Sequence, residues 1–321
     1  MLEKLITLWK KNGIGLLVVP LFVVFSIICP TFLKVDNLLN ILRQSAILGT
    51  LVVGVTFVMI SGNCDLSVGS IIAVIGVILA LLIENLGVPV WLAVIIAILI
   101  GVFTNALNGI LAVTIKVTPF VITLATMSFW SGVTYVLSNA KVLMIRNDAF
   151  RIFGQGMIAG KIPVIVVIFL VMLLIGMFIL NKTYFGRYVY AIGGNRDAAH
   201  LAGININRMT IYTHMVSGVF VGIAAVLYTS RVMCSQPNAA ANYHFDCITA
   251  ACLGGVSMAG GEGKLSGCAL GVIALQILFN GMTLLGVNEF WQKIATGLVL
   301  LLAITLDSVQ RNLTVKKEGN A

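Results

Sequence analysis

Charged residues are scarce in this sequence. Asp, Glu, Lys and Arg make up only 10 % of its 321 residues, whereas 60 % are hydrophobic. Soluble domains carry about 45–50 % apolar residues, so a soluble fold could not hide this much apolar surface from water. The formal net charge of +9 could suggest nucleic-acid binding, but the basic residues lie at the ends of apolar runs and in loops. We therefore expect an integral membrane protein that contacts lipids and no nucleic acid.

Motifs for catalysis and metal binding are also missing. The sequence has no GxSxG or HExxH motif, and its three histidines are too far apart to suggest a metal site. The six cysteines have no CxxC spacing and lie mostly in apolar segments, as small buried side chains do. Cys234 and Cys247 flank an expected external loop, which leaves a disulfide open there. We expect no catalytic residue, metal site or cofactor.

A nucleotide-binding motif is missing as well. Gly263 and Lys264 look like part of a P-loop, but Met258 occupies the position of the required glycine. Leu265 follows the lysine where the motif needs Ser or Thr. The chain therefore has no expected nucleotide site of its own, and any ATP must be bound by a partner.

Long apolar runs, in contrast, are numerous. A spanning helix needs about 20 residues, and ten runs of that order lie near residues 13–29, 45–62, 67–84, 90–115, 118–138, 162–180, 210–230, 245–258, 266–286 and 289–306. With both termini cytoplasmic, twelve of the twenty Lys and Arg fall in cytoplasmic segments and seven outside, in line with the positive-inside rule. An odd number of helices stays open as an alternative. The sequence predicts an all-α polytopic protein with one transmembrane domain over residues 1–321.

Three segments are expected as extracytoplasmic loops: 30–44, 139–161 and 231–244. Residues 30–44 alternate polar and apolar residues at helical spacing and could lie along the membrane interface. The loop 139–161 carries Arg146, Asp148 and other charged residues. It is either a solvated loop or a docking surface for an external protein of complementary charge.

The longest polar interruption, residues 181–209, is expected on the cytoplasmic side, since it carries four Lys or Arg and one Asp. Its centre predicts a short capped helix with small residues on one side. Such a helix, exposed by a membrane protein, suits contact with a soluble partner. The residues expected to make that contact are Asn195, Arg196, Asp197, Ala198, Ala199, His200, Ala202 and Gly203.

Two polar or glycine-rich breaks interrupt apolar stretches. Backbone that leaves helical geometry at membrane depth must find its hydrogen bonds in protein or in a water-filled cavity. Asp65 in hydrocarbon would cost about 2.5–3.5 kcal/mol, so it should be capped, paired or hydrated, and Asp65 or Ser67 should cap the next helix. The residues of the first break are Ser61, Gly62, Asn63, Asp65, Ser67, Gly69 and Ser70, and those of the second are Gly254, Gly255, Gly260 and Gly261.

The first break is either a tight turn at the membrane surface or a broken helix at a transport pathway. The second break, between residues 253 and 267, is a loose echo of the first. Both join an apolar run to a helix start that contains Leu-Ser. Paired interruptions in two halves suggest an internal repeat of the kind that transporters use.

Small residues also predict close helix contacts. Gly218 and Gly222 form one GxxxG pair, Gly267 and Gly271 form another, and Gly101, Asn105 and Gly109 share one face of their helix. Such residues let helix backbones approach closely, so core packing is the expected role. Glu289 and Lys293, four residues apart, are expected to form a structural pair.

Four segments resemble a known family. SGNCDLSVGS is similar to the SGGIDLSVGS signature of permease subunits of bacterial ATP-binding-cassette (ABC) importers for monosaccharides, the ribose, galactose and xylose group. FGRYVYAIGGNRDAAHLAGININRM resembles their cytoplasmic coupling loop, ACLGGVSMAGGEGKLSG their second glycine-rich element, and NGMTLLGVNEFWQ the segment that follows. The resemblance runs from about residue 30 to 308. Asn63, Cys64, Glu262 and Cys268 depart from the family pattern, so the resemblance does not name the sugar.

The resemblance implies the ten-helix type II importer fold shared with vitamin B12 permeases, in the bacterial cytoplasmic (inner) membrane. It implies two permease subunits, identical or paralogous, with ABC ATPase subunits below and a periplasmic or lipid-anchored sugar-binding protein above. The helix around Arg196–Gly203 would then sit in a groove of the ATPase, and the two breaks would lie at or near the sugar pathway. Ion-coupled secondary carriage is the alternative, and it would need Asp65 as its membrane carboxylate. A membrane scaffold without transport would not need two polar breaks.

Overall fold

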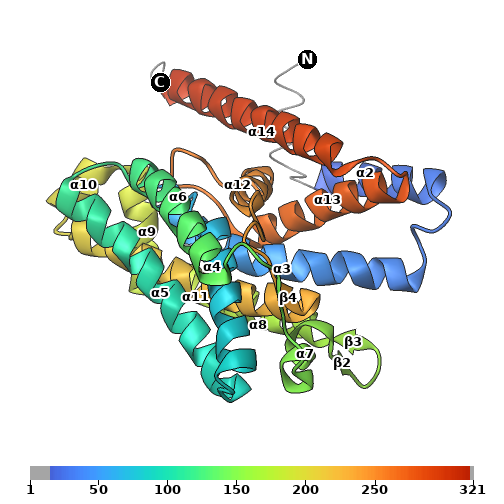
Figure 1. Cartoon of the computed structure of the whole chain (residues 1–321). Coiled ribbons are helices and arrows are strands. Elements are labelled where there is room, and N and C mark those ends of the chain that lie inside the picture. Colours follow the sequence, from blue (N-terminus) through green and yellow to red (C-terminus); the bar gives the residue numbers. More distant parts are fainter. Residues whose placement is uncertain (1–14, 319–321) are drawn as a thin grey trace.

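The computed structural model describes the backbone of residues 15–318 and the side chains of residues 18–305, 308 and 309. The basic residues Lys4, Lys10 and Lys11, on which part of the topology prediction rests, lie outside the described residues, as does the start of the expected span 13–29. Helices make up most of the described chain (Figure 1). The long helices are α2 (Gly15–Ile28), α3 (Val35–Ile60), α4 (Val68–Ala80), α5 (Val90–Ile115), α6 (Pro119–Ser138), α8 (Val164–Lys182), α11 (Ile206–Val232), α13 (Leu265–Leu284) and α14 (Glu289–Glu318).

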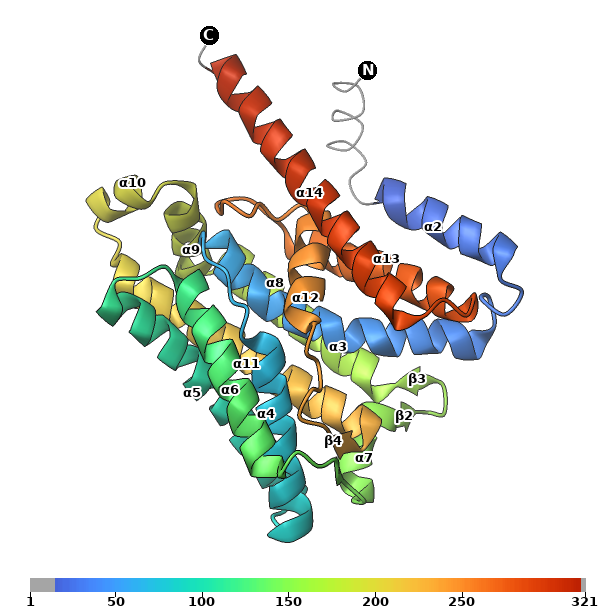
Figure 2. The same ribbon diagram turned by 45° about the horizontal axis from the view of Figure 1, so that its top comes forward.

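Shorter elements connect them. One π-helical turn, η1 (Leu81–Asn85), extends α4. The short helices are α7 (Asp148–Gln155), α9 (Tyr184–Gly194), α10 (Arg196–Leu201) and α12 (Tyr243–Leu253). The strands β1 (Leu143–Met144) and β4 (Cys234–Ser235) pair antiparallel, as do β2 (Met157–Ile158) and β3 (Ile162–Pro163). Both ribbon views place α10 at one end of the bundle and the β2–β3 hairpin at the other, with α8 and α11 running between (Figures 1 and 2).

Seven helical segments in the described part of the chain are long and apolar enough to cross a membrane. They confirm seven of the ten predicted runs. They are Val35–Ile60, Val68–Asn85, Val90–Ile115, Pro119–Ser138, Val164–Lys182, Ile206–Val232 and Leu265–Leu284. The other three predicted runs fall in α2, α12 and α14.

The run 245–258 does not form a spanning helix. α12 has only 11 residues, which at 1.5 Å per residue gives about 16 Å, roughly half of a hydrocarbon core of about 30 Å. The chain before it turns into the bundle, where Ala239 and Ala240 are 8 % and 7 % exposed. The carbonyl of Ala240 lies against Gly69 in the first turn of α4. The segment 231–244 is therefore partly buried rather than a free loop.

The structure also differs from the expected loop 30–44, because residues 35–44 are the first turns of α3. Their polar side chains pack against other helices. Asn37 and Asn280 of α13 exchange two hydrogen bonds of 2.9 and 2.8 Å, and Arg231 of α11 donates to Asn40 at 2.8 Å. The polar and apolar alternation thus reflects packing against two helices. The loop 139–161 is likewise folded, with α7 anchored by Phe150, whose side chain is fully buried.

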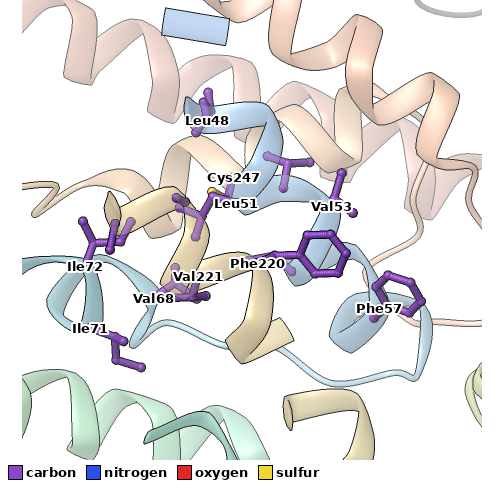
Figure 3. Packing of buried hydrophobic residues seen from close by; sticks show 14 of the residues in the cluster. Leu48, Leu51, Val53, Phe57, Val68, Ile71, Ile72, Phe220, Val221 and Cys247 are labelled. Atoms are coloured by element: carbon purple, nitrogen blue, oxygen red, sulfur yellow. The ribbon is translucent and has the colours of Figure 1, made fainter. Parts of the chain in front are cut away.

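The core lies where α3, α4, α11 and α12 meet (Figure 3). Leu51 and Phe57 of α3, Ile71 of α4 and Val221 of α11 are fully enclosed, as is Cys247 of α12. Burying a side chain such as Leu or Phe stabilises a fold in water by about 1.5–3 kcal/mol. Between helices inside a membrane, tight packing takes over that role.

Glycines bring the helices together as the sequence predicts. A Cβ added to Gly101 of α5 would overlap the backbone of Gly218 in α11, and one on Gly222 would lie 2.7 Å from Ile98 Cα. Gly271 of α13 meets the backbone of α12 in the same way. Core packing is therefore the role of these small residues.

A disulfide that the sequence left open and an expected ion pair are both absent among the described side chains. All six cysteines are free, so no disulfide joins Cys234 to Cys247. The one ion pair among the described side chains joins Arg151 to Asp148 at 3.5 Å. The prediction of a Glu289–Lys293 pair is wrong, since Lys293 Nζ instead lies 5.5 Å from the ring centroid of Phe290.

Candidate functional site

The first break, between α3 and α4, is buried. α3 ends at Ile60, and Ser61, Asp65 and Ser67 in the following segment are at most 3 % exposed. Asn63 is 8 % exposed and donates to the Ser61 hydroxyl at 3.0 Å. Burial of this many polar groups favours a broken helix over a solvated turn.

Asp65 holds the start of α4. Its Oδ1 accepts hydrogen bonds from the Ser67 backbone N–H at 2.8 Å and from the Ser67 hydroxyl at 2.6 Å. Asn108 of α5 donates to the same hydroxyl at 2.8 Å, and Leu66 N–H donates to Thr123 Oγ1 of α6 at 3.2 Å. Thr123 of α6 thus takes up backbone groups that leave the helix, as buried backbone requires, while Asn108 of α5 fixes the Ser67 side chain. Asp65 Oδ2 is buried without a hydrogen-bond partner within the described residues.

Two residues of the predicted set lie in the first turn of α4. Gly69 accommodates the carbonyl of Ala240, which a side chain would overlap. The Ser70 hydroxyl donates to the Ser67 carbonyl at 2.8 Å. Both residues serve the packing of this helix start.

The second break, between α12 and α13, depends on glycine conformations. Gly255, Gly260 and Gly261 have φ values of +85°, +88° and +76°, a region that costs other residues about 1–2 kcal/mol. Gly254 lies apart from the latter two and packs against the backbone of Gly267 in α13. The chain can therefore reverse between the two helices without side chains in the way.

The two breaks meet each other and the end of α9. Gly261 N–H donates to the Ile60 carbonyl, the last of α3, at 2.8 Å. A Cβ added to Gly260 would lie 2.6 Å from Gly62 Cα, and one on Gly193 would overlap the Ile60 carbonyl. Three segments far apart in sequence thus touch backbone to backbone. We call this contact the glycine junction, and it consists of Gly62, Gly193, Gly194, Gly260 and Gly261.

A tyrosine of α9 stabilises the glycine junction through a hydrogen bond. The Tyr190 hydroxyl donates to the Gly263 carbonyl in the second break at 2.7 Å. Burial, with a smaller contribution from Cys268, raises the pKa of the phenol above its ordinary value. The phenol therefore keeps its proton and its donor role at neutral pH.

α10 begins one residue after the junction. Asn195 caps it, since Asn195 Oδ1 accepts from Ala198 N–H at 2.9 Å, the usual N-cap geometry. At the other end Gly203, at φ +85°, donates to the His200 carbonyl at 2.9 Å, and Ile204 N–H donates to the Ala199 carbonyl at 3.0 Å. These two bonds form a Schellman motif. The short capped helix predicted from Asn195 to Gly203 is therefore present.

Most of α10 is open to contact. Arg196, Asp197, Ala198 and His200 are exposed, as are the flanking residues Asn195, Ala202 and Gly203. Ala199 is the exception: it is only 3 % exposed, so its methyl group packs inward and cannot present a small surface to a partner. Leu201, absent from the predicted set, is 86 % exposed.

Several residues of this site are not evident from the sequence. α9 was hidden inside a segment expected to be a polar loop, although Phe185, Val189 and Ile192 recur at helical spacing and Val189 and Ile192 are buried. The adjacent Gly193 and Gly194 give no local signal, because their role lies in contacts with distant segments. The same holds for Asn108 and Thr123.

Comparison with known proteins gives a family match over most of the chain. Residues 37–304 match the family described as branched-chain amino acid transport system / permease component. The chain is 35 % identical over 303 residues to the ribose import permease protein of Haemophilus influenzae, with 93 % of each chain covered. It is 39 % identical over 289 residues to the ribose import permease protein of Bacillus subtilis, with 89 % of each covered.

A third relative is named for the transport of a different sugar. The chain is 32 % identical over 340 residues to the xylose transport system permease protein of Escherichia coli, with 87 % of this chain and 86 % of the relative covered. No solved structure gave a significant match to the chain.

Proposed function

The chain belongs to the family of branched-chain amino acid transport system permease components and is the transmembrane subunit of an ABC sugar importer. On this premise we propose that α10 receives the movement of the partner ATPase and that the glycine junction passes it to both broken segments. An importer of this family works with an ATPase and a sugar-binding protein, so the driving force must enter this chain through a contact with a partner.

The observation that carries the proposal is the position of the junction. Asn195, the cap of α10, follows directly on Gly194, and a Cβ on Gly261 would lie 2.7 Å from Gly194 Cα. Backbone in direct contact has no side-chain rotamer to absorb a displacement, and packed interiors transmit strain. A shift of α10 therefore reaches the ends of α3 and α12–α13 without an intermediate.

The surface around α10 suits a protein partner. A hollow of about 350 Å³ beside it is lined by Lys116, Arg196, Asn207 and other residues. The basic pair and the exposed Leu201 suit an ATPase groove with acidic residues around an apolar floor.

We further propose that the broken segments lie at or near the pathway for a monosaccharide, ribose or a related pentose or hexose. The names of the ribose and xylose relatives support this cargo. Asn63 and Asp65 belong to the first broken segment, and no base pairs with Asp65 among the described side chains. Neutral polyols need amide and hydroxyl partners rather than ion pairs.

The assembly follows from the same proposal. Two such chains, identical or paralogous, enclose the pathway in a ten-helix type II importer fold with both termini cytoplasmic. The ATPase subunits bind on the α10 side, and a periplasmic or lipid-anchored sugar-binding protein docks on the β2–β3 side. The distance between α10 and the hairpin in both ribbon views supports this polarity (Figures 1 and 2).

The test is charge reversal on α10 in the complete importer. Arg196→Glu and Asp197→Lys are expected to lower sugar uptake and receptor-stimulated ATP hydrolysis while the chain still inserts into the membrane. Lys182→Glu, the same reversal on an exposed lysine in the last turn of α8 and outside α10, is the matched control for ATPase coupling. Normal uptake and ATPase stimulation in both α10 variants would refute the coupling role.

A further inference from the structure

A polar cavity of about 540 Å³ lies at the opposite end of α13 from the glycine junction. Its volume falls within the about 300–1,000 Å³ of small-molecule sites. It is lined by the first half of α3, the end of α11, the segment before α12, the second half of α13 and the first turns of α14. None of the residues assigned above to coupling or to the broken segments lines it.

Four amide side chains on its wall are unpaired. Gln44, Asn238, Asn242 and Gln276 line the cavity, and none of their side chains makes a hydrogen bond to another described residue. Gln276 is only 7 % exposed, so what little of it is accessible faces the cavity. Leaving a buried amide without a partner is unfavourable, which applies to Gln276, whereas Asn238 and Asn242 are exposed side chains. An amide both donates and accepts, so four of them match a ligand that offers donors and acceptors at once.

The cavity wall carries ionisable side chains of both signs. Arg231 and Lys293 are basic, and Asp246 and Glu289 are acidic. Arg231 is held by its bond to Asn40 at 2.8 Å, and burial raises the pKa of the Asp246 carboxyl to about 7. Asp246 is therefore partly protonated at neutral pH. Only two basic side chains line the wall, and one of them is engaged by Asn40, which favours a neutral ligand over a phosphorylated one.

The residues that line the cavity do not suit a ligand such as an amino acid with a branched apolar side chain. Its carbon-rich residues are few, chiefly Ala240, Ala241 and Phe279, beside the ring of Tyr243. Burial of a Leu, Ile or Val side chain is favourable only against apolar surroundings. This wall offers little of that surface, whereas its amides suit hydroxyl groups.

We propose that this cavity is a transient binding site for a neutral monosaccharide, held by Gln44, Asn238, Asn242 and Gln276. The inference rests on the proposed function, since it assigns the sugar a place in the half of the molecule that faces the sugar-binding protein. The cavity is the first site after release from that protein, before the sugar reaches the broken segments.

A direct test measures protection of a cysteine in the cavity. Ala241→Cys places a thiol on the exposed part of the wall, and its alkylation by iodoacetamide is followed by mass spectrometry on the full chain in lipid nanodiscs. D-ribose or D-xylose is expected to slow alkylation at least about fivefold, and L-leucine is not. Ala202→Cys, outside the cavity, is the control and should react at the same rate with and without sugar.

A second measurement removes the amides. Gln276→Leu in the complete importer is expected to lower the sugar moved per ATP hydrolysed about tenfold, with receptor-stimulated ATP hydrolysis kept. Gln276→Asn, which keeps an amide, should lose less. Gln236→Leu, an exposed glutamine of the segment before α12 that does not line the cavity, is the matched control.

The outcomes separate the two proposals. If the unaltered importer moves no sugar, the proposed function itself fails. If it moves sugar, but Ala241→Cys is not protected and Gln276→Leu transports normally, only the cavity proposal is overturned. Protection by L-leucine in place of sugar overturns it as well. A Gln276→Leu chain that fails to insert leaves the protection assay to decide.

Discussion

Single atoms decide the behaviour of the glycine junction. At Gly193 and Gly260 the contact surface is the backbone itself, so even one added methyl group must displace another segment. A Cβ on Gly62 would make only an ordinary contact, 3.5 Å from the Ala259 carbonyl oxygen. Asp65 works through a single oxygen, which accepts both hydrogen bonds from Ser67. At this scale, small substitutions should therefore have sharp and separable effects.

Gly260→Ala is expected to destabilise the chain and impair coupling. The new Cβ meets Gly62 Cα at 2.6 Å, and a φ of +88° adds strain of about 1–2 kcal/mol. Gly255→Ala is the matched control, because φ is +85° there but nothing lies within 4 Å of the added Cβ. Thermal unfolding of both purified variants gives the difference between their melting temperatures. Because the φ strain is nearly equal in the two, this difference reports the contact between residues 260 and 62. Equal melting temperatures would mean that the junction is not tightly packed.

Asp65→Asn is expected to preserve ATP-driven uptake, because the amide oxygen can still accept from Ser67. Asp65→Ala removes that acceptor and leaves the buried Ser67 N–H unpaired, at a cost of about 1–3 kcal/mol. Uptake and melting temperature of the two variants test this. A well-folded Asp65→Asn chain without uptake would show that the negative charge itself is needed, as ion-coupled carriage requires.

At the scale of elements, local sequence signals succeed where a helix is stabilised by its own ends. α10 has only six residues, too few for stability by length, and Asn195 and Gly203 supply both caps. α12 and the start of α3 are different, because their limits follow from contacts with α4, α11 and α13. Hydropathy alone therefore predicts the wrong limits for α12 and for the start of α3.

Asn195→Ala should loosen α10 more than Asn205→Ala loosens α11. Both asparagines cap a helix, with Oδ1 accepting from Ala198 N–H at 2.9 Å and from Arg208 N–H at 3.0 Å. Losing a cap costs about 0.5–2 kcal/mol, which a six-residue helix cannot absorb and a packed helix of 27 residues can. Hydrogen exchange of residues 196–203 and 206–212 compares them. If the two variants lost amide protection equally in their respective helices, α10 would not depend on its N-cap more than α11 does.

At the scale of the molecule, the polarity of the bundle links the two proposals. α10 and the glycine junction lie at one end, and the polar cavity opens toward the other end of α13, whose 20 residues extend about 30 Å. In the two proposals, energy enters at one face and sugar at the opposite one. The orientation in the membrane decides which face is which.

Thiol labelling of intact cells tests that orientation. Gly160→Cys in the turn between β2 and β3 should react with a membrane-impermeant maleimide from outside, and Ala198→Cys in α10 should react only after the membrane is opened. Both positions are exposed, and a Cβ at Gly160 meets nothing within 4 Å. The parent chain, whose six native cysteines are free, supplies the background. Reversed labelling would invert the topology.

The sequence by itself determined the membrane character, seven of the spans, the capped helix at Asn195–Gly203 and the family. These depend on composition, on neighbouring residues or on motifs, which a linear reading contains. The tertiary structure decided that Gly62, Gly193 and Gly260 touch and that amides from α3, α13 and the segment before α12 share one cavity. Such contacts depend on how helices rotate and cross, and no local pattern encodes that.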